Sequence, residues 1–185
     1  MEDIKIFCAI DTKNIEQALK IGNQIKKYVN GVKLGSEFFS SAGPEGVQKI
    51  KNELDLPIFL DLKLFDIPST VIKTIDSLKS LSIEYLSIHL LSAKETLLLA
   101  REKAEQNSIK LLGVTVLTSM NQKNLGEIGF TKSLENQIEV LARLAVETKI
   151  HGIICSPRDI KKIKSICKKM EIVTPGIRMK KVVGD

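Results

Sequence analysis

The sequence predicts an α/β fold of the TIM-type (β/α)8 barrel class, with about seven βα units evident in residues 1–185. Short apolar runs alternate with longer segments of helical period, which is typical of βα units on a parallel sheet. Polar residues follow several of the expected strands, and this is where β/α barrels place their reactive groups. The first turn, AIDTKN, contains no glycine. A doubly wound sheet normally has a glycine-rich first turn, so the barrel is favoured.

The expected strands are short runs rich in apolar residues, each followed by a polar loop residue. In chain order they cover residues 4–10, 31–35, 57–62, 85–90, 110–117, 152–156 and 171–176. The segments between them carry apolar residues at three- and four-residue spacing, as amphipathic helices do. These expected helices cover residues 14–29, 43–54, 69–81, 93–106, 133–148 and 156–170.

Seven strands are one fewer than a closed barrel of this type contains. Residues 1–185 are therefore expected to form a single β/α barrel domain that is incomplete at its C-terminal end, or one that another chain closes. No low-complexity or Pro/Ser-rich linker divides the chain, which also favours one domain.

Composition excludes several classes of function. A net charge of +6 favours an anionic partner, but aromatic residues are only 4% and tryptophan is absent, so a nucleic-acid binder is not expected. No apolar run approaches the length of a membrane span, and no leader precedes the first strand. The three cysteines are far apart and have no metal-binding spacing. We therefore expect a cytoplasmic protein that binds a small anionic molecule, not a membrane or nucleic acid.

Charged residues interrupt the apolar run FLDLKLFDIPST at residues 59–70. Asp61 and Lys63 are two residues apart, so on a strand both side chains point to the same face and can pair. Lys33 ends the second expected strand and would lie beside this pair if the two strands are neighbours. Asp66 follows the strand, in a loop that Pro68 turns. Such an alternating array is either a structural network of ion pairs or a reactive centre.

The segment DLKLFDIPST at residues 61–70 resembles the DxKxxDIPxT signature of bacterial orotidine 5'-phosphate decarboxylase. Four further segments match that family in the same order. They are AID ending at Asp11, GVKLGSEFF around Lys33, VTVLTSM around Thr118, and TPGIR ending at Arg178. The resemblance implies decarboxylation of orotidine 5'-phosphate to uridine 5'-phosphate, the last step of UMP synthesis, without a cofactor or metal.

The resemblance also implies a role for each matching residue. Lys63 would deliver a proton to C6 of the pyrimidine once carbon dioxide leaves, and Asp61 would lie against the substrate carboxylate. Lys33 would pair with Asp61 and contact the ribose, and Asp11 would hold a ribose hydroxyl.

Other matching residues are expected to act across a homodimer or at the ends of the nucleotide. Asp66, Ile67 and Thr70 would reach into the site of a partner subunit. Thr118 would lie beside the pyrimidine, and Arg178 would help hold the phosphate.

Two alternatives remain open on the sequence. The family usually continues past TPGIR into a loop with a glutamine and an eighth strand with a Gly-Arg pair, and neither follows Asp185, so a non-catalytic remnant is one alternative. A magnesium-dependent sugar-phosphate decarboxylase or hexulose-phosphate synthase shares DxKxxD, but it places an acidic metal ligand where Lys33 stands. No metal site is expected, and His89 is interpreted as a residue at the barrel rim that orients its neighbours.

Overall fold

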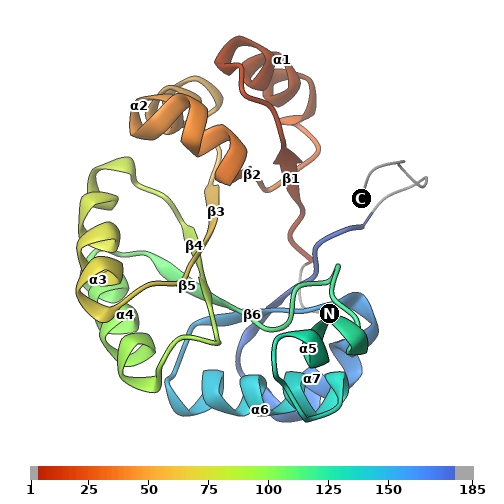
Figure 1. The fold of residues 1–185 in the computed structure, drawn as a ribbon. Helices are drawn as coiled ribbons and strands as arrows, with labels where there is room; N and C mark the ends of the chain where they lie inside the picture. Colours follow the sequence, from red (N-terminus) through yellow and green to blue (C-terminus); the bar gives the residue numbers. More distant parts are fainter. Residues whose placement is uncertain (1–3, 178–185) are drawn as a thin grey trace.

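The computed structural model describes residues 4–177, and these form one sheet of seven parallel strands in the order β1 to β7. The strands are β1 (Phe7–Ile10), β2 (Gly31–Gly35), β3 (Ile58–Leu64), β4 (Tyr85–His89), β5 (Lys110–Val114), β6 (Gly152–Ile154) and β7 (Glu171–Val173). Each strand pairs with the next along the chain, and the sheet curls so that one face lies inside (Figure 1). Within the described residues, β1 and β7 are the two edges of this sheet. The prediction of about seven βα units in a TIM-type arrangement is confirmed.

The helices form the outer layer of this curled sheet (Figure 1). They are α1 (Ile15–Ile25), α2 (Ser36–Leu54), α3 (Pro68–Ser77), α4 (Lys94–Gln106), α5 (Gln122–Glu127), α6 (Leu134–Glu147) and α7 (Ile160–Ile166), with short 3-10 turns η1 (Lys79–Leu81) and η2 (Pro157–Asp159). No helix among residues 4–177 is long and apolar enough to cross a membrane.

Several helices differ from the sequence prediction. The helix expected at 14–29 ends at Ile25, and the one expected at 69–81 divides into α3 and η1. The helix expected at 43–54 begins earlier, at Ser36, and is kinked at Gly43, whose φ of 60° interrupts it before Pro44. The helix expected at 156–170 divides into η2 and α7. The sequence did not predict α5, a helix of six residues that Asn121 caps together with Asn124. An asparagine at the third helical position is a weaker signal than the Glu or Gln of a usual capping box.

Two apolar layers hold the fold together, one on each face of the sheet. The larger lies between the sheet and the helices and includes Leu34, Leu60 and Leu86, all fully buried. The smaller lies inside the curl and contains Phe59, Tyr85, Leu112, Val114 and Ile154. Neighbouring residues along a strand point to opposite faces, so β3 contributes Leu60 outward and Phe59 inward. The interior is therefore packed and is not a channel.

A polar cluster closes the interior at the amino-terminal ends of the strands. The Tyr85 hydroxyl donates to Glu171 Oε2 at 2.5 Å, and Lys110 Nζ contacts Glu171 Oε1 at 2.6 Å. Burial, reinforced by the bond to Glu171, raises the pKa of Tyr85 well above its ordinary value of 10, so the hydroxyl stays protonated as a donor. Burial alone would raise the pKa of Glu171, but the bonds from Lys110 and Tyr85 outweigh it and hold that pKa below 4.5. The cluster ties β7 to β4 and β5.

Replacing Tyr85 by Phe should therefore destabilise the protein without disturbing its packing. The ring keeps its edge contacts with Phe7 and Phe59, at centroid distances of 5.5 and 6.2 Å, but Glu171 loses a donor. We expect the free energy of unfolding in urea to fall by about 1 to 3 kcal/mol. Tyr28→Phe is the matched control, since the Tyr28 side chain is exposed. Equal effects of the two substitutions would show that the Glu171 contact contributes nothing.

Candidate active site

Four charged side chains meet at the carboxyl ends of β1, β2 and β3. Lys63 Nζ lies 2.8 Å from Asp61 Oδ2, and Lys33 Nζ lies 3.7 Å from the same oxygen. Lys33 Nζ also lies 3.5 Å from Asp11 Oδ1. The signs alternate along Asp11, Lys33, Asp61 and Lys63, so every charge has an opposite neighbour. We call these four residues the charged array. Of the alternating array that the sequence predicted, Lys33, Asp61 and Lys63 lie together, but Asp66 does not join them; Asp11, which the family resemblance placed at the site, takes the fourth position.

Exposure is graded across the charged array. The side chain of Asp61 is 12% exposed and that of Lys33 21%, whereas Lys63 is 40% and Asp11 59% exposed. A carboxylate as buried as that of Asp61 is costly unless it is paired and hydrogen-bonded. The ammonium groups of Lys63 and Lys33 both contact Asp61 Oδ2, so the buried carboxylate is paired. The two exposed ends of the array remain available to a ligand.

A backbone irregularity in β3 places Lys63. Leu60 pairs with Leu86 of β4, but the next pair is Leu64 with Ile88, so residues 61–63 face a single residue of β4. Lys63 has φ of 49°, in the left-handed region that costs a residue with a side chain about 1 to 2 kcal/mol. The sequence predicts a regular strand with both side chains on one face. The expected contact is present, but it depends on this bulge.

Ser87, which links Asp61 and Lys63, was not among the residues predicted from the sequence. Its hydroxyl donates to Asp61 Oδ1 at 2.7 Å and accepts from the Lys63 backbone N–H at 2.8 Å. The signal was present: the run YLSIHL places a polar Ser87 on the same face as Tyr85 and His89. A serine in an apolar strand is too common to be selected without a partner.

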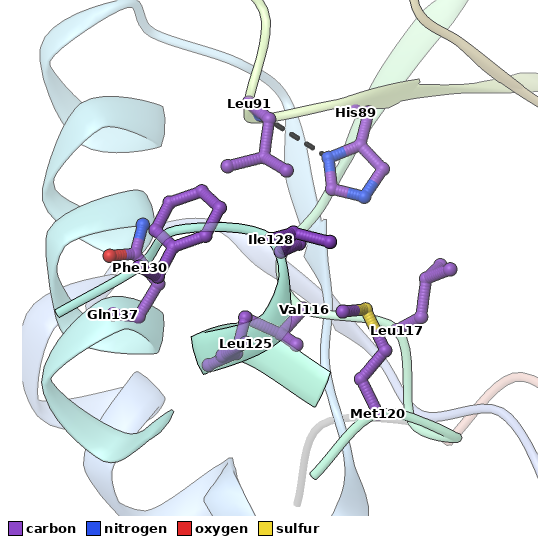
Figure 2. A pocket seen from close by; sticks show the side chains of 9 residues that line it. All are labelled: His89, Leu91, Val116, Leu117, Met120, Leu125, Ile128, Phe130 and Gln137. Carbon is purple, nitrogen blue, oxygen red and sulfur yellow. Dashed lines mark hydrogen bonds between the residues drawn. The ribbon is translucent and has the colours of Figure 1, made fainter. Parts of the chain in front are cut away.

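His89 ends β4 beside an apolar pocket. The other lining residues come from the loop after β4, the segment after β5 with its helix α5, and α6 (Figure 2): Leu91, Val116, Leu117, Met120, Leu125, Ile128, Phe130 and Gln137. His89 Nδ1 accepts from the Leu91 backbone N–H at 3.2 Å, which leaves the proton of the neutral ring on Nε2. Burial, with the nearby Lys63 ammonium, lowers the pKa of His89 below 6.5. The ring is therefore neutral near pH 7 and holds the backbone that follows β4.

The residues predicted to act across a dimer lie outside the charged array. Asp66, Ile67 and Thr70 are exposed, and Asp66 Oδ1 accepts only from the backbone N–H of Ile67, at 2.7 Å, among the bonds found in residues 4–177. Phe65 and Ile67 expose 63% and 64% of their surface. Together with Pro68 and the start of α4, they line a shallow surface groove.

The two remaining predicted residues are Thr118 and Arg178. Thr118 is exposed in the turn that follows β5, next to Leu117 of the apolar pocket. Arg178 lies outside the described residues.

The array can supply an ammonium group held against a buried carboxylate at the open end of the sheet. An ammonium in that position can stabilise negative charge that develops on a bound molecule and can transfer a proton to it. Within residues 4–177, no three His, Cys, Asp or Glu side chains are grouped so that they could hold a metal ion.

Comparison with known protein families gives one match along nearly the whole chain. The sequence model described as "Orotidine 5'-phosphate decarboxylase / HUMPS family" matches residues 5–185. An orotidine 5'-phosphate decarboxylase of Wolbachia pipientis subsp. Culex pipiens is 41% identical over 175 residues, covering 94% of this chain and 77% of that protein. One of Ehrlichia canis is 40% identical over 181 residues, covering 97% of this chain and 79% of that protein.

Solved structures with similar folds include enzymes of the same name. Orotidine 5'-phosphate decarboxylase from Lactobacillus acidophilus has a TM-score of 0.86 and 33% identity, covering 95% of this chain and 82% of its own. Orotidine 5'-monophosphate decarboxylase from Methanocaldococcus jannaschii, in complex with the inhibitor BMP, has a TM-score of 0.80 and 25% identity. The match covers 95% of this chain and 78% of that one.

Stability should fall in mild acid because two histidines are held neutral. Burial lowers the pKa of His151, as it does that of His89, and His151 Nδ1 accepts from the Leu111 backbone N–H at 3.0 Å. Below about pH 6.5 the unfolded chain binds protons that the folded chain does not, so stability rises with pH there and levels off above. Each histidine contributes at most about 1.4 kcal/mol per pH unit.

Urea unfolding at several pH values between 5 and 8 measures this dependence. His151→Asn keeps an acceptor for Leu111 but cannot titrate, so we expect a smaller slope below pH 6.5 than in the wild type. An unchanged slope would show that His151 has the same pKa in the folded and unfolded chains.

Proposed function

Because the chain belongs to the orotidine 5'-phosphate decarboxylase / HUMPS family, we propose that it decarboxylates orotidine 5'-phosphate to uridine 5'-phosphate. The observation that carries the proposal is the Lys63 ammonium held 2.8 Å from the buried Asp61 carboxylate. The names of the relatives favour this reaction over other activities in the family. Lys33 in the array also argues against a magnesium site there, since an ammonium would repel the cation.

Lys63 acts as the proton donor in this proposal. When the bond between C6 and the carboxylate breaks, carbon dioxide leaves and the electron pair stays on C6. The Lys63 ammonium stabilises this charge as it develops and transfers a proton to C6. An interaction that strengthens only as the charge forms lowers the barrier, because it favours the transition state over the bound substrate.

The other members of the array hold Lys63 and the sugar. Asp61 holds the Lys63 ammonium in place, with Nζ 2.8 Å from its Oδ2. It also lies where the substrate carboxylate would bind. The partly exposed Lys33 and Asp11 are placed to bind ribose hydroxyls. Thr118 would approach the pyrimidine, and Arg178 the phosphate.

The surface loop after β3 supports a homodimer. Asp66 bonds to no member of the array, and Phe65 and Ile67 expose large apolar surfaces beside it. We infer that this loop packs on a second copy of the chain. Asp66, Ile67 and Thr70 then complete the partner's site, while Lys63 serves the site of its own chain.

Lys63→Ala should abolish turnover. Loss of both the proton donor and the fixed positive charge should lower kcat by at least roughly 10³-fold, with the fold unchanged. Absorbance loss of orotidine 5'-phosphate measures the rate, chromatography identifies the product, and circular dichroism tests the fold. Lys20→Ala is the matched control, because Lys20 is exposed on α1.

Three outcomes would contradict the proposal. A wild-type chain that leaves the substrate unchanged would exclude the reaction. Full activity of the Lys63→Ala variant would place the proton donor elsewhere. Loss of wild-type activity on addition of a chelator would favour metal-dependent chemistry.

Mixing two inactive variants tests the shared site. In a dimer of Lys63→Ala with Asp66→Asn, one site carries both substitutions and the other carries neither. Random exchange of subunits in an equal mixture should restore about one quarter of wild-type activity. Native mass spectrometry verifies that mixed dimers form. If they form and the mixture stays inactive, both residues belong to the site of one chain.

A further inference from the structure

Ser87 occupies the centre of β4 and is fully buried, with 0% of its surface exposed. Its hydroxyl uses both kinds of hydrogen bond that the group can make. It accepts from the Lys63 backbone N–H at 2.8 Å and donates to Asp61 Oδ1 at 2.7 Å. A single side chain therefore holds the backbone of Lys63 and the carboxylate of Asp61.

The bulge in β3 makes this contact necessary. Residues 61–63 lie opposite Ser87 alone, and the Lys63 N–H donates to the Ser87 hydroxyl instead of continuing the regular register between β3 and β4. A backbone N–H shielded from water needs an acceptor, and the Ser87 hydroxyl supplies one to Lys63. It thereby supports the left-handed backbone of Lys63, which a regular strand would not adopt.

The same hydroxyl sets the orientation of the Asp61 carboxylate. Ser87 binds Oδ1, and Lys63 Nζ binds Oδ2 at 2.8 Å, so the carboxylate cannot rotate without breaking one of these bonds. The position of the Lys63 ammonium is then defined from two directions, by its own backbone and by the fixed carboxylate.

We propose that Ser87 is a positioning residue that directs the Lys63 ammonium at the reacting carbon, an inference that rests on the proposed decarboxylation. Because Ser87 is fully buried, it acts on the substrate only through Asp61 and Lys63. A displacement of about 1 Å in a reacting group can cost roughly 10²-fold in rate. Loss of the hydroxyl should therefore lower kcat much more than it changes KM.

Three substitutions at Ser87 test the role. Ser87→Ala should lower kcat by about 10²-fold and change KM by less than about threefold. Ser87→Cys is close in size to serine but bonds weakly, so it should remain slow. Ser87→Thr keeps the hydroxyl and should recover most of kcat. Equal rates for all three variants and the wild type would overturn the proposal, as would a loss confined to KM.

Thr148→Val controls for the loss of a buried hydrogen bond. Thr148 is fully buried at the end of α6, and its hydroxyl donates to Leu144 O at 2.7 Å, away from the charged array. This variant should show a lower melting temperature with kcat unchanged. If kcat falls in Thr148→Val as far as in Ser87→Ala, general destabilisation explains both.

A crystal structure of Ser87→Ala gives a readout that does not depend on turnover. We expect Lys63 to leave the left-handed region, or its Nζ to move away from Asp61 Oδ2 by more than about 0.5 Å. An unchanged pair would overturn the positioning role even if the wild-type enzyme is active. An inactive wild type with a displaced pair in the variant would instead count against the proposed reaction and leave the positioning role supported.

Discussion

A carboxylate buried inside a curled sheet needs several partners at once, and Asp61 determines how the open end of this fold is arranged. Its two oxygens take a bond from Ser87 and contacts from two ammonium groups. Those partners come from three adjacent strands, so the order of β2, β3 and β4 is a condition for the site. The net contribution of such a buried network to stability is small, but removing Asp61 would leave Lys63 without its carboxylate partner.

The sequence predicted the strands and most helices because their apolar periods are local properties of the chain. It also predicted the array, since alternation along β3 and adjacency of β2 and β3 place Asp61, Lys63 and Lys33 together. It did not predict the bulge at Lys63, because the backbone irregularity depends on the acceptor that Ser87 offers from another strand. The early start of α2 was missed because Gly43 and Pro44 normally end a helix.

Charged residues have different roles at the amino and carboxyl ends of the strands. At the amino end, Tyr85, Lys110 and Glu171 satisfy one another and tie distant strands together. At the carboxyl end, Lys33 and Asp61 are paired and largely buried, whereas Asp11 and part of Lys63 stay open to solvent. This matches the general division in β/α barrels between a stabilising face and a reactive face.

The partial exposure of Lys63 has a consequence for repeated cycles. In the proposed reaction, Lys63 gives its proton to the product and must regain one before the next substrate binds; the 40% of its side chain that is open to water would provide the route. Asp61 can remain in place throughout, because its buried oxygens keep their bond to Ser87 and their contact with Lys33. Recharging the amine therefore requires no opening of the sheet.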